Sequence, residues 1–202
     1  MRDDYHKEKK FLKEVVGAFG ISSNGSRAGV ITFSLRAEHS IKMKDHADIN
    51  SFNAAVDVIP LMGLTTRIDR ALNLAKMELF AEENGGRATT PNILILLTDG
   101  KQTKGTVKSP ADDPAMITEE LRKAGVIVFI VGIGAGTDMK ELDHMAGGPG
   151  QSIHAATFDV LIGDEFISNI TEKGCEIGMY DFLTSFSDYN TKNSFIKHLY
   201  LN

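Results

Sequence analysis

The chain has 202 residues, 42% of them hydrophobic, and a formal net charge of −5 at pH 7. This length suits a single α/β domain, and the apolar fraction is large enough to build a core, so a wholly disordered chain is excluded. The mild acidity argues against a nucleic-acid-binding protein, which normally carries a basic face. No apolar run reaches the about 18 residues of a membrane helix, so we expect no membrane insertion.

The first half of the chain alternates helical patterns with two short strands. Apolar residues in 4–19 recur at helical spacing, and residues 38–43 alternate between polar and apolar, which is typical of a half-exposed edge strand. We expect a helix over 4–19, strands over 28–33 and 38–43, and helices over 49–59 and 68–82.

The second half contains two strongly aliphatic runs, 92–97 and 126–133, which are typical of parallel strands covered on both faces. We expect these as strands, with helices over 114–123 and 138–145, a short strand over 152–155 and a closing helix over 160–173. Alternating strands and helices predict an α/β fold: a mainly parallel sheet with helices on both faces and one antiparallel edge strand.

The C-terminal part differs from the rest of the chain. Six aromatic residues fall within 177–202, and no clean period links them. We therefore predict one domain over 1–174 followed by a tail over 175–202, the alternative being a last helix packed on the domain.

Two polar residues stand where such a sheet binds its ligands, at the carboxyl ends of the strands. Asp99 directly follows the apolar run 92–97, and Thr66 precedes the helix predicted from residue 68. Their oxygens are hard ligands, suited to magnesium or calcium. The simpler interpretation is that Thr66 caps a helix and Asp99 orders a turn.

Four segments in this order resemble one known family. They are Ala28–Ser34 (AGVITFS), Gly63–Leu72 (GLTTRIDRAL), Ile95–Lys101 (ILLTDGK) and Val128–Gly134 (VFIVGIG). The sequence resembles a von Willebrand factor A domain over about residues 4–174. This resemblance implies a Rossmann-like sheet.

The resemblance also implies a metal-ion-dependent adhesion site with ligands from three loops. Thr66 matches the threonine of the second loop, with Thr65 as the fallback, and Asp99 matches the carboxylate of the third loop. The implied ion is Mg²⁺, or else Ca²⁺ or Mn²⁺, and an acidic side chain of a partner protein completes its coordination.

The chain departs from the family at the first loop. The motif Asp-x-Ser-x-Ser, which follows the central first strand in the family, is absent from the sequence. That strand is expected between 28–33 and 92–97. We therefore expect an N-terminally incomplete domain of a longer protein, in which cation binding is weak or absent.

By this resemblance the protein is a non-enzymatic adhesion module, secreted to the extracellular matrix, that binds a matrix or cell-surface protein. One alternative is a structural A-domain that assembles without metal, and cytoplasmic family members make an intracellular role conceivable. A third is a nucleotide-binding enzyme, suggested by the glycine-rich segment 132–138, although Thr137 occupies the third glycine position of the fingerprint.

Three further positions are candidates for modification. Asn24 and Asn169 each begin an Asn-x-Ser/Thr sequon, and Asn24 lies in a predicted turn. Cys175 is the only cysteine, so no disulfide forms within the chain. The resemblance implies a bridge from Cys175 to a cysteine ahead of the first strand; the alternative is a free thiol.

Overall fold

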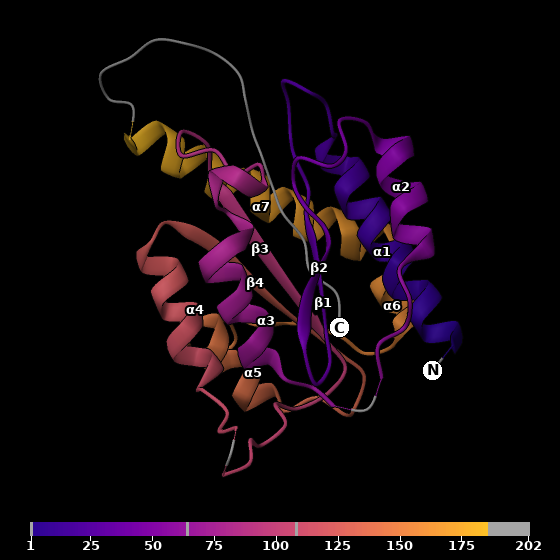
Figure 1. Ribbon diagram of the computed structural model, residues 1–202, viewed down its shortest axis with the longest axis vertical. Helices are drawn as coiled ribbons and strands as arrows, with labels where there is room; N and C mark the ends of the chain where they lie inside the picture. Colours follow the sequence, from indigo (N-terminus) through magenta and orange to yellow (C-terminus); the bar gives the residue numbers. More distant parts are fainter. Residues whose placement is uncertain (1, 64, 108, 186–202) are drawn as a thin grey trace.

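The computed structural model describes residues 2–63, 65–107 and 109–185, with side chains described for 4–63, 65–107 and 109–174. The strands form a central layer, and helices lie on both sides of it (Figure 1). The α/β class predicted from the sequence is confirmed.

Three parallel strands form the larger sheet, in the order β3 (Asn92–Thr98), β4 (Val126–Ile133) and β5 (Ile153–Ala155). Asn92 lies opposite Val126 and Thr98 opposite Gly132, without a register shift. Alternate side chains of β3 enter different halves of the core, with Ile95 on one face and Leu96 on the other. Burial on both faces explains the continuous aliphatic sequence.

A separate two-stranded sheet contains β1 (Val30–Phe33) and β2 (Ala37–Ile41), paired antiparallel. β2 is the antiparallel strand that the alternating sequence predicts. Within the described chain, β1 and β3 are not hydrogen-bonded to each other, so the sheet is interrupted between them. The interruption falls where the family resemblance places a further strand.

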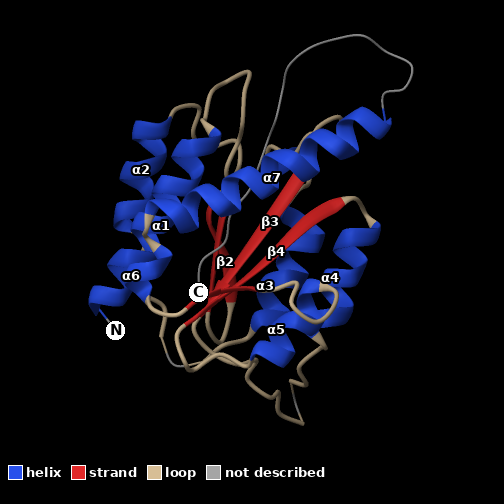
Figure 2. Cartoon of the chain, turned by 180° about the vertical axis from the view of Figure 1, so that it is seen from behind, coloured by secondary structure: helices blue, strands red, loops and turns tan. Residues whose placement is uncertain are grey.

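The helices form two layers, one on each side of the strands (Figure 2). The core of one face includes side chains of α1 (Arg2–Phe19), α2 (Ile49–Val58), α6 (Phe158–Leu161) and α7 (Asp164–Ser185). The core of the other face includes side chains of α3 (Ile68–Leu74), α4 (Pro114–Lys123) and α5 (Met139–Ala146). β1 contributes to both cores, through Val30 on one face and Ile31 on the other.

Two helices differ from the sequence prediction. The helix expected over 68–82 is α-helical only as far as Leu74, and then continues as the π-helical segment η1 (Ala75–Leu79) before the 3₁₀ turn η2 (Glu82–Asn84). The closing helix expected over 160–173 is divided into α6 and α7. Thr157 caps α6 by accepting a hydrogen bond from the Val160 amide at 3.2 Å, a local contact that apolar spacing does not reveal.

α7 extends to Ser185 and so crosses the boundary predicted after residue 174. Residues 186–202 lie outside the described part of the chain, and the division into a domain and a tail stays a prediction.

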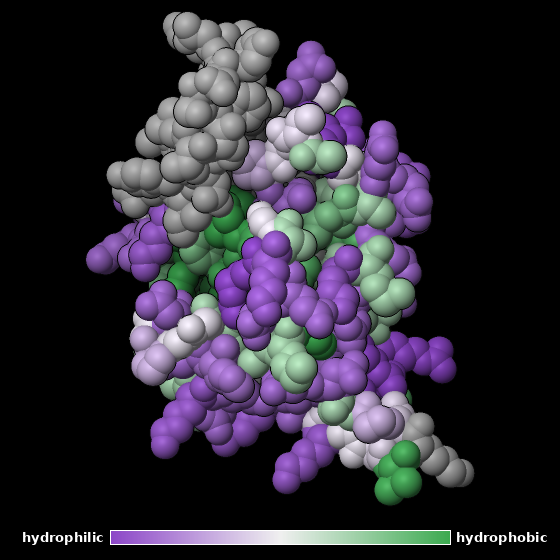
Figure 3. Space-filling view, turned by 90° about the vertical axis from the view of Figure 1, so that its left-hand side faces the viewer, coloured by the Kyte–Doolittle hydropathy of each residue, from purple (hydrophilic) through white to green (hydrophobic). Residues whose placement is uncertain are grey.

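The surface seen from the left of Figure 1 is mainly hydrophilic, with apolar residues showing between the polar ones (Figure 3). No helix in the described part of the chain combines the length and the apolar character needed to cross a membrane.

Candidate metal centre

Thr66 and Asp99 come together although they are far apart in the sequence. Thr66 lies in the loop before α3, and Asp99 directly follows β3. A Cβ atom built on Gly100 would lie 3.2 Å from the Thr66 hydroxyl oxygen. The Thr66 hydroxyl therefore lies against the backbone that carries Asp99.

Thr66 does not have the simpler role of a helix cap that its sequence context allows. The N-cap of α3 is Arg67, and its side chain makes no capping hydrogen bond. The turn after β3 is ordered by Thr98, whose hydroxyl donates to the Gly100 carbonyl at 3.1 Å and accepts from the Gly100 amide at 3.3 Å. Thr66 is therefore not explained as a helix cap, and Thr98 contributes to the order of the turn that carries Asp99.

Thr103 fixes the Thr66 loop against the loop after Asp99. Its amide donates to the Thr66 carbonyl at 2.8 Å, and its hydroxyl accepts from the Thr66 amide at 2.9 Å. Both backbone groups of Thr66 are thus held by one residue, which fixes the place from which its side chain projects.

A buried ion pair between Arg67 and Asp69 holds the same two loops together. The Arg67 guanidinium donates to both carboxylate oxygens of Asp69, at 2.8 and 2.6 Å, and Gln102 donates to Asp69 at 2.7 Å. Burial raises the pKa of the Asp69 carboxyl, but the hydrogen bonds from Arg67 and Gln102 outweigh it and leave the pKa below its usual value. Asp69 therefore stays ionised and connects α3 to the loop after β3.

The glycine-rich segment after β4 packs against the same loop. A Cβ atom on Gly136 would lie 2.8 Å from the Asp99 carbonyl oxygen, so only glycine fits there without a shift. Asp138 caps α5 by accepting from the Lys140 amide at 3.1 Å, and Lys101 lies 3.2 Å from it. A carboxylate thus covers the helix N-terminus that a dinucleotide phosphate would need, which argues against a nucleotide-binding site.

Sequence reasoning missed Glu8, a buried carboxyl on α1. Glu8 is 6% exposed, and its Oε2 atom has no hydrogen-bond partner among the described residues. Burial above all, and then the negative charges of Asp99 and Asp4, raise the pKa of the Glu8 carboxyl to about 9. Glu8 therefore lies within electrostatic reach of Asp99.

The sequence does carry a signal for Glu8. It stands in the apolar stripe of α1, three residues after Tyr5 and four before Leu12, all of them buried. A charged residue in such a stripe is costly unless it is paired or has another function. The adjacent Lys9 does not supply that pairing, because its ammonium group donates to the Asp57 carbonyl at 2.9 Å.

The oxygen atoms near Asp99 are of the kind that hard divalent cations take as ligands. They belong to Asp99 and Thr66; the hydroxyl oxygen of the fallback residue Thr65, next in the chain to Thr66, is buried and lacks a hydrogen-bond partner in the described chain. Within the described ranges, no three His, Cys, Asp or Glu side chains gather into a metal-binding group. A cation here has at most two carboxylates and depends on hydroxyl or exogenous oxygens for the rest.

The remaining predicted positions lie elsewhere. Asn24 and Asn169 are both exposed, Asn24 in a bend and Asn169 on α7. Cys175 also falls on α7, but its side chain lies outside the described part, so its disulfide stays a prediction.

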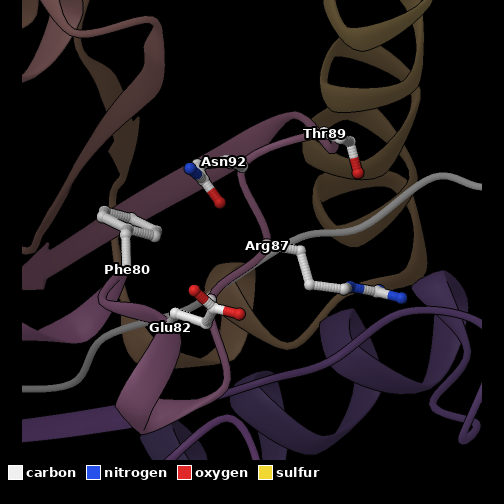
Figure 4. Close-up of a pocket in the computed structure, with 7 residues that line it drawn as sticks. Phe80, Glu82, Arg87, Thr89 and Asn92 are labelled. Carbon is white, nitrogen blue, oxygen red and sulfur yellow. The ribbon is translucent and has the colours of Figure 1, made fainter.

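A separate cavity of about 410 Å³ lies at the start of β3, the opposite end of that strand from Asp99. Phe80, Glu82 and Asn92 are among the residues that line it (Figure 4). It contains none of the predicted metal ligands.

Comparison with known proteins identifies the family of the fold. The family model of the von Willebrand factor type A domain matches residues 1–166. The collagen alpha-6(VI) chain of Mus musculus is 28% identical over 170 residues, which are 83% of this chain and 7% of the relative. Matrilin-1 of Gallus gallus is 28% identical over 149 residues, 72% of this chain and 28% of the relative. The chain thus spans less than a third of the length of these relatives.

A solved structure of proximal thread matrix protein 1 from the mussel byssus has a TM-score of 0.72 and 26% identity, over 86% of this chain and 42% of that one. Another structure of the mussel protein, 20% identical to this chain, has a zinc-occupied MIDAS motif, and at that identity the likeness shows the fold alone. The family match over most of the chain, together with the strand order and the two helix layers, leads to one conclusion: the chain belongs to the von Willebrand factor type A domain family.

Proposed function

We propose that this chain is a non-enzymatic adhesion module that binds an extracellular-matrix or cell-surface protein through a divalent cation. The observation that carries the proposal is the contact between Thr66 and the backbone next to Asp99. Residues 33 positions apart in the sequence are brought together at the carboxyl end of β3, where sheets of this class bind ligands.

Thr66 and Asp99 hold the cation in this proposal. Mg²⁺ suits such a site best, with Ca²⁺ or Mn²⁺ as alternatives, because Mg²⁺ is commonly held by one or two carboxylates and keeps exogenous ligands. The cation supplies an open coordination position that an acidic side chain of the partner fills. The hydrogen bonds of Thr103 and the Asp69 pair keep the two loops in place while the partner binds.

The relatives support a matrix role. They include a collagen VI chain, matrilin-1 and a byssal thread matrix protein. On this ground we propose that the protein is secreted. In that location the exposed Asn24 and Asn169 are glycosylated, and Cys175 forms a disulfide with a cysteine outside this chain.

The test is adhesion of the full chain to matrix laid down by cultured fibroblasts, measured in Mg²⁺ and in EDTA. We expect EDTA to abolish retention, and Asp99→Asn to lower it to the EDTA level in Mg²⁺. Asp164→Asn changes an exposed aspartate at the start of α7 and is the matched control, expected to bind as the wild type does.

Retention that persists in EDTA and in Asp99→Asn would overturn the cation-bridge proposal. It would favour a structural A-domain that assembles through its surface without metal.

A further inference from the structure

Two arginine side chains cross between the segment that precedes β1 and the segment that precedes β3. Arg27 donates to the Gly85 carbonyl at 2.9 Å, and Arg87 donates to the Gly25 carbonyl at 2.6 Å. Each arginine thus contacts the carbonyl two residues before the other, which brings the two guanidinium groups into one cluster. Burial, and then the positive charge of Arg27, lower the pKa of the Arg87 guanidinium.

A lysine adds a third positive charge to this cluster. The Lys44 ammonium donates to the Glu83 carbonyl at 2.6 Å, and the Lys44 amide donates to the Asn84 carbonyl at 3.2 Å. In the described part of the chain, none of the three basic side chains forms an ion pair with a carboxylate. Even with the exposed Glu82 and Glu83 of the same loop counted, the cluster keeps a net positive charge, which attracts an anion.

The cavity of about 410 Å³ at the start of β3 adjoins this cluster, because Arg87 lines it together with Asn92. The Nε atom of Arg87 and the Oδ1 atom of Asn92 are both buried and lack a hydrogen-bond partner among the described residues. Figure 4 shows the Asn92 side-chain oxygen pointing into the cavity. Buried polar atoms without a partner are rare in folded proteins, and the volume lies within the about 300–1,000 Å³ of small-molecule sites.

These two atoms define what a ligand has to offer. The Arg87 Nε–H needs an acceptor, best an anionic one, whereas the Asn92 oxygen needs a donor. A simple oxyanion such as sulfate has acceptors only and satisfies one of the two. An acidic sugar has both, since its carboxylate or sulfate group stands beside ring hydroxyls, and further hydroxyls suit Glu82 and Thr89, which also line the cavity.

We propose that the cavity at the start of β3 binds an acidic saccharide unit, whose anionic group contacts Arg87 and whose hydroxyl donates to Asn92. An acidic peptide offers the same kinds of group, but on a flexible chain, whereas a sugar ring holds them rigidly at short spacing, which lowers the entropic cost of binding. The site lies at the opposite end of β3 from Asp99, so the binding is independent of the cation proposed above.

The test is calorimetric titration of a chondroitin sulfate disaccharide into the full 202-residue chain in EDTA. We expect Arg87→Gln to weaken binding about 10- to 100-fold, because a charge-assisted hydrogen bond is lost. Asn92→Asp is expected to weaken it by about tenfold or more, because the new carboxylate competes with the anionic group of the sugar for Arg87. Arg36→Gln removes one positive charge at an exposed position between β1 and β2, and as the matched control it is expected to keep the affinity.

Melting curves establish which variants are folded, and Asn92→Asp decides if Arg87→Gln unfolds, since no hydrogen bond of the Asn92 oxygen is lost in it. Wild-type affinity in the folded variants, or an equal loss in Arg36→Gln, would mean general attraction to a charged surface and would overturn the site.

Two competitors test the class of ligand. Inorganic sulfate at matched ionic strength, or an acetylated aspartyl-glycine amide, that displaces the disaccharide at equal concentration would overturn the saccharide assignment in favour of a simple anion or an acidic peptide. A folded wild type that binds no disaccharide would overturn the proposal as a whole. The cation site is unaffected by any of these results, because EDTA is present throughout.

Discussion

Asp69 shows how much one buried residue contributes to the site. Asp69 is 1% exposed, and its carboxylate accepts hydrogen bonds from Arg67, Gln102 and the Asp112 amide. These partners belong to the segments that carry Thr66 and Asp99. The carboxylate therefore sets the positions of residues that it does not itself touch.

Asp69→Ala should lower the free energy of unfolding by about 3–5 kcal/mol, because it leaves the Arg67 guanidinium buried without its counter-charge. Urea denaturation at pH 7 measures the change. Glu119→Ala breaks an exposed pair with Lys123 on α4 and is expected to leave the free energy of unfolding almost unchanged, because water screens an exposed ion pair. Equal effects of the two substitutions would show that the buried pair has no special role.

Glu8 illustrates how burial changes the protonation of a single carboxyl group. Its raised pKa means that the folded protein keeps a proton that the unfolded chain releases at neutral pH. The uncharged amide of glutamine avoids this difference at nearly the same volume.

Glu8→Gln is therefore expected to raise the free energy of unfolding at pH 7 in EDTA, by up to about 3 kcal/mol. Urea denaturation of the two proteins side by side gives the difference. A variant less stable than the wild type in EDTA would mean that the Glu8 carboxyl makes a stabilising contact that glutamine cannot replace.

At the scale of the elements, short side chains join neighbouring helices. Thr118 of α4, fully buried, donates its hydroxyl to the Met145 carbonyl in the last turn of α5 at 2.8 Å, and Arg122 donates to the same carbonyl at 2.7 Å. These two residues satisfy a carbonyl that the end of α5 leaves without a helical partner. They fix α5, whose N-cap Asp138 lies beside the candidate site.

Thr118→Val keeps the shape of the side chain but removes this hydrogen bond, and should cost about 0.5–1.5 kcal/mol of unfolding free energy, because Arg122 still satisfies the carbonyl. Thermal or urea denaturation checks this. Thr171→Val is the control, because the Thr171 hydroxyl bonds only to carbonyls of its own helix, at 3.0 Å. If both variants lose the same stability, the bridge between α4 and α5 adds nothing.

The sequence predicts most of the elements because their patterns are local. α4 and β4 occur over the predicted residues, 114–123 and 126–133. The ends of α3 and the break between α6 and α7 were not predicted. They depend on a change of helix type and on a cap at Thr157, and neither alters the apolar spacing.

At the scale of the whole molecule, the interruption between β1 and β3 is the main feature. Each strand is hydrogen-bonded on one side only in the described chain, yet both contribute side chains to the same two cores. Unpaired backbone groups next to a core are unfavourable, and open strand edges promote association between chains.

The 202-residue chain is accordingly expected to be marginally stable and prone to aggregate on heating. Calorimetry at several protein concentrations, with light scattering, tests this. A sharp melt that is reversible and independent of concentration would contradict the expectation and would mean that the interrupted sheet is tolerated.

The sequence by itself determined the α/β class, the parallel strands, the edge strand and the family, since these follow from periodic patterns and from short motifs read along the chain. It also singled out Thr66 and Asp99. Only the tertiary structure decided that the Thr66 hydroxyl lies against the backbone next to Asp99, and that Thr103 and Asp69 hold their loops. The reason is physical: hydrophobic periodicity reports which face of an element is buried, whereas a ligand site depends on which loops the folded strands bring to one end of the sheet.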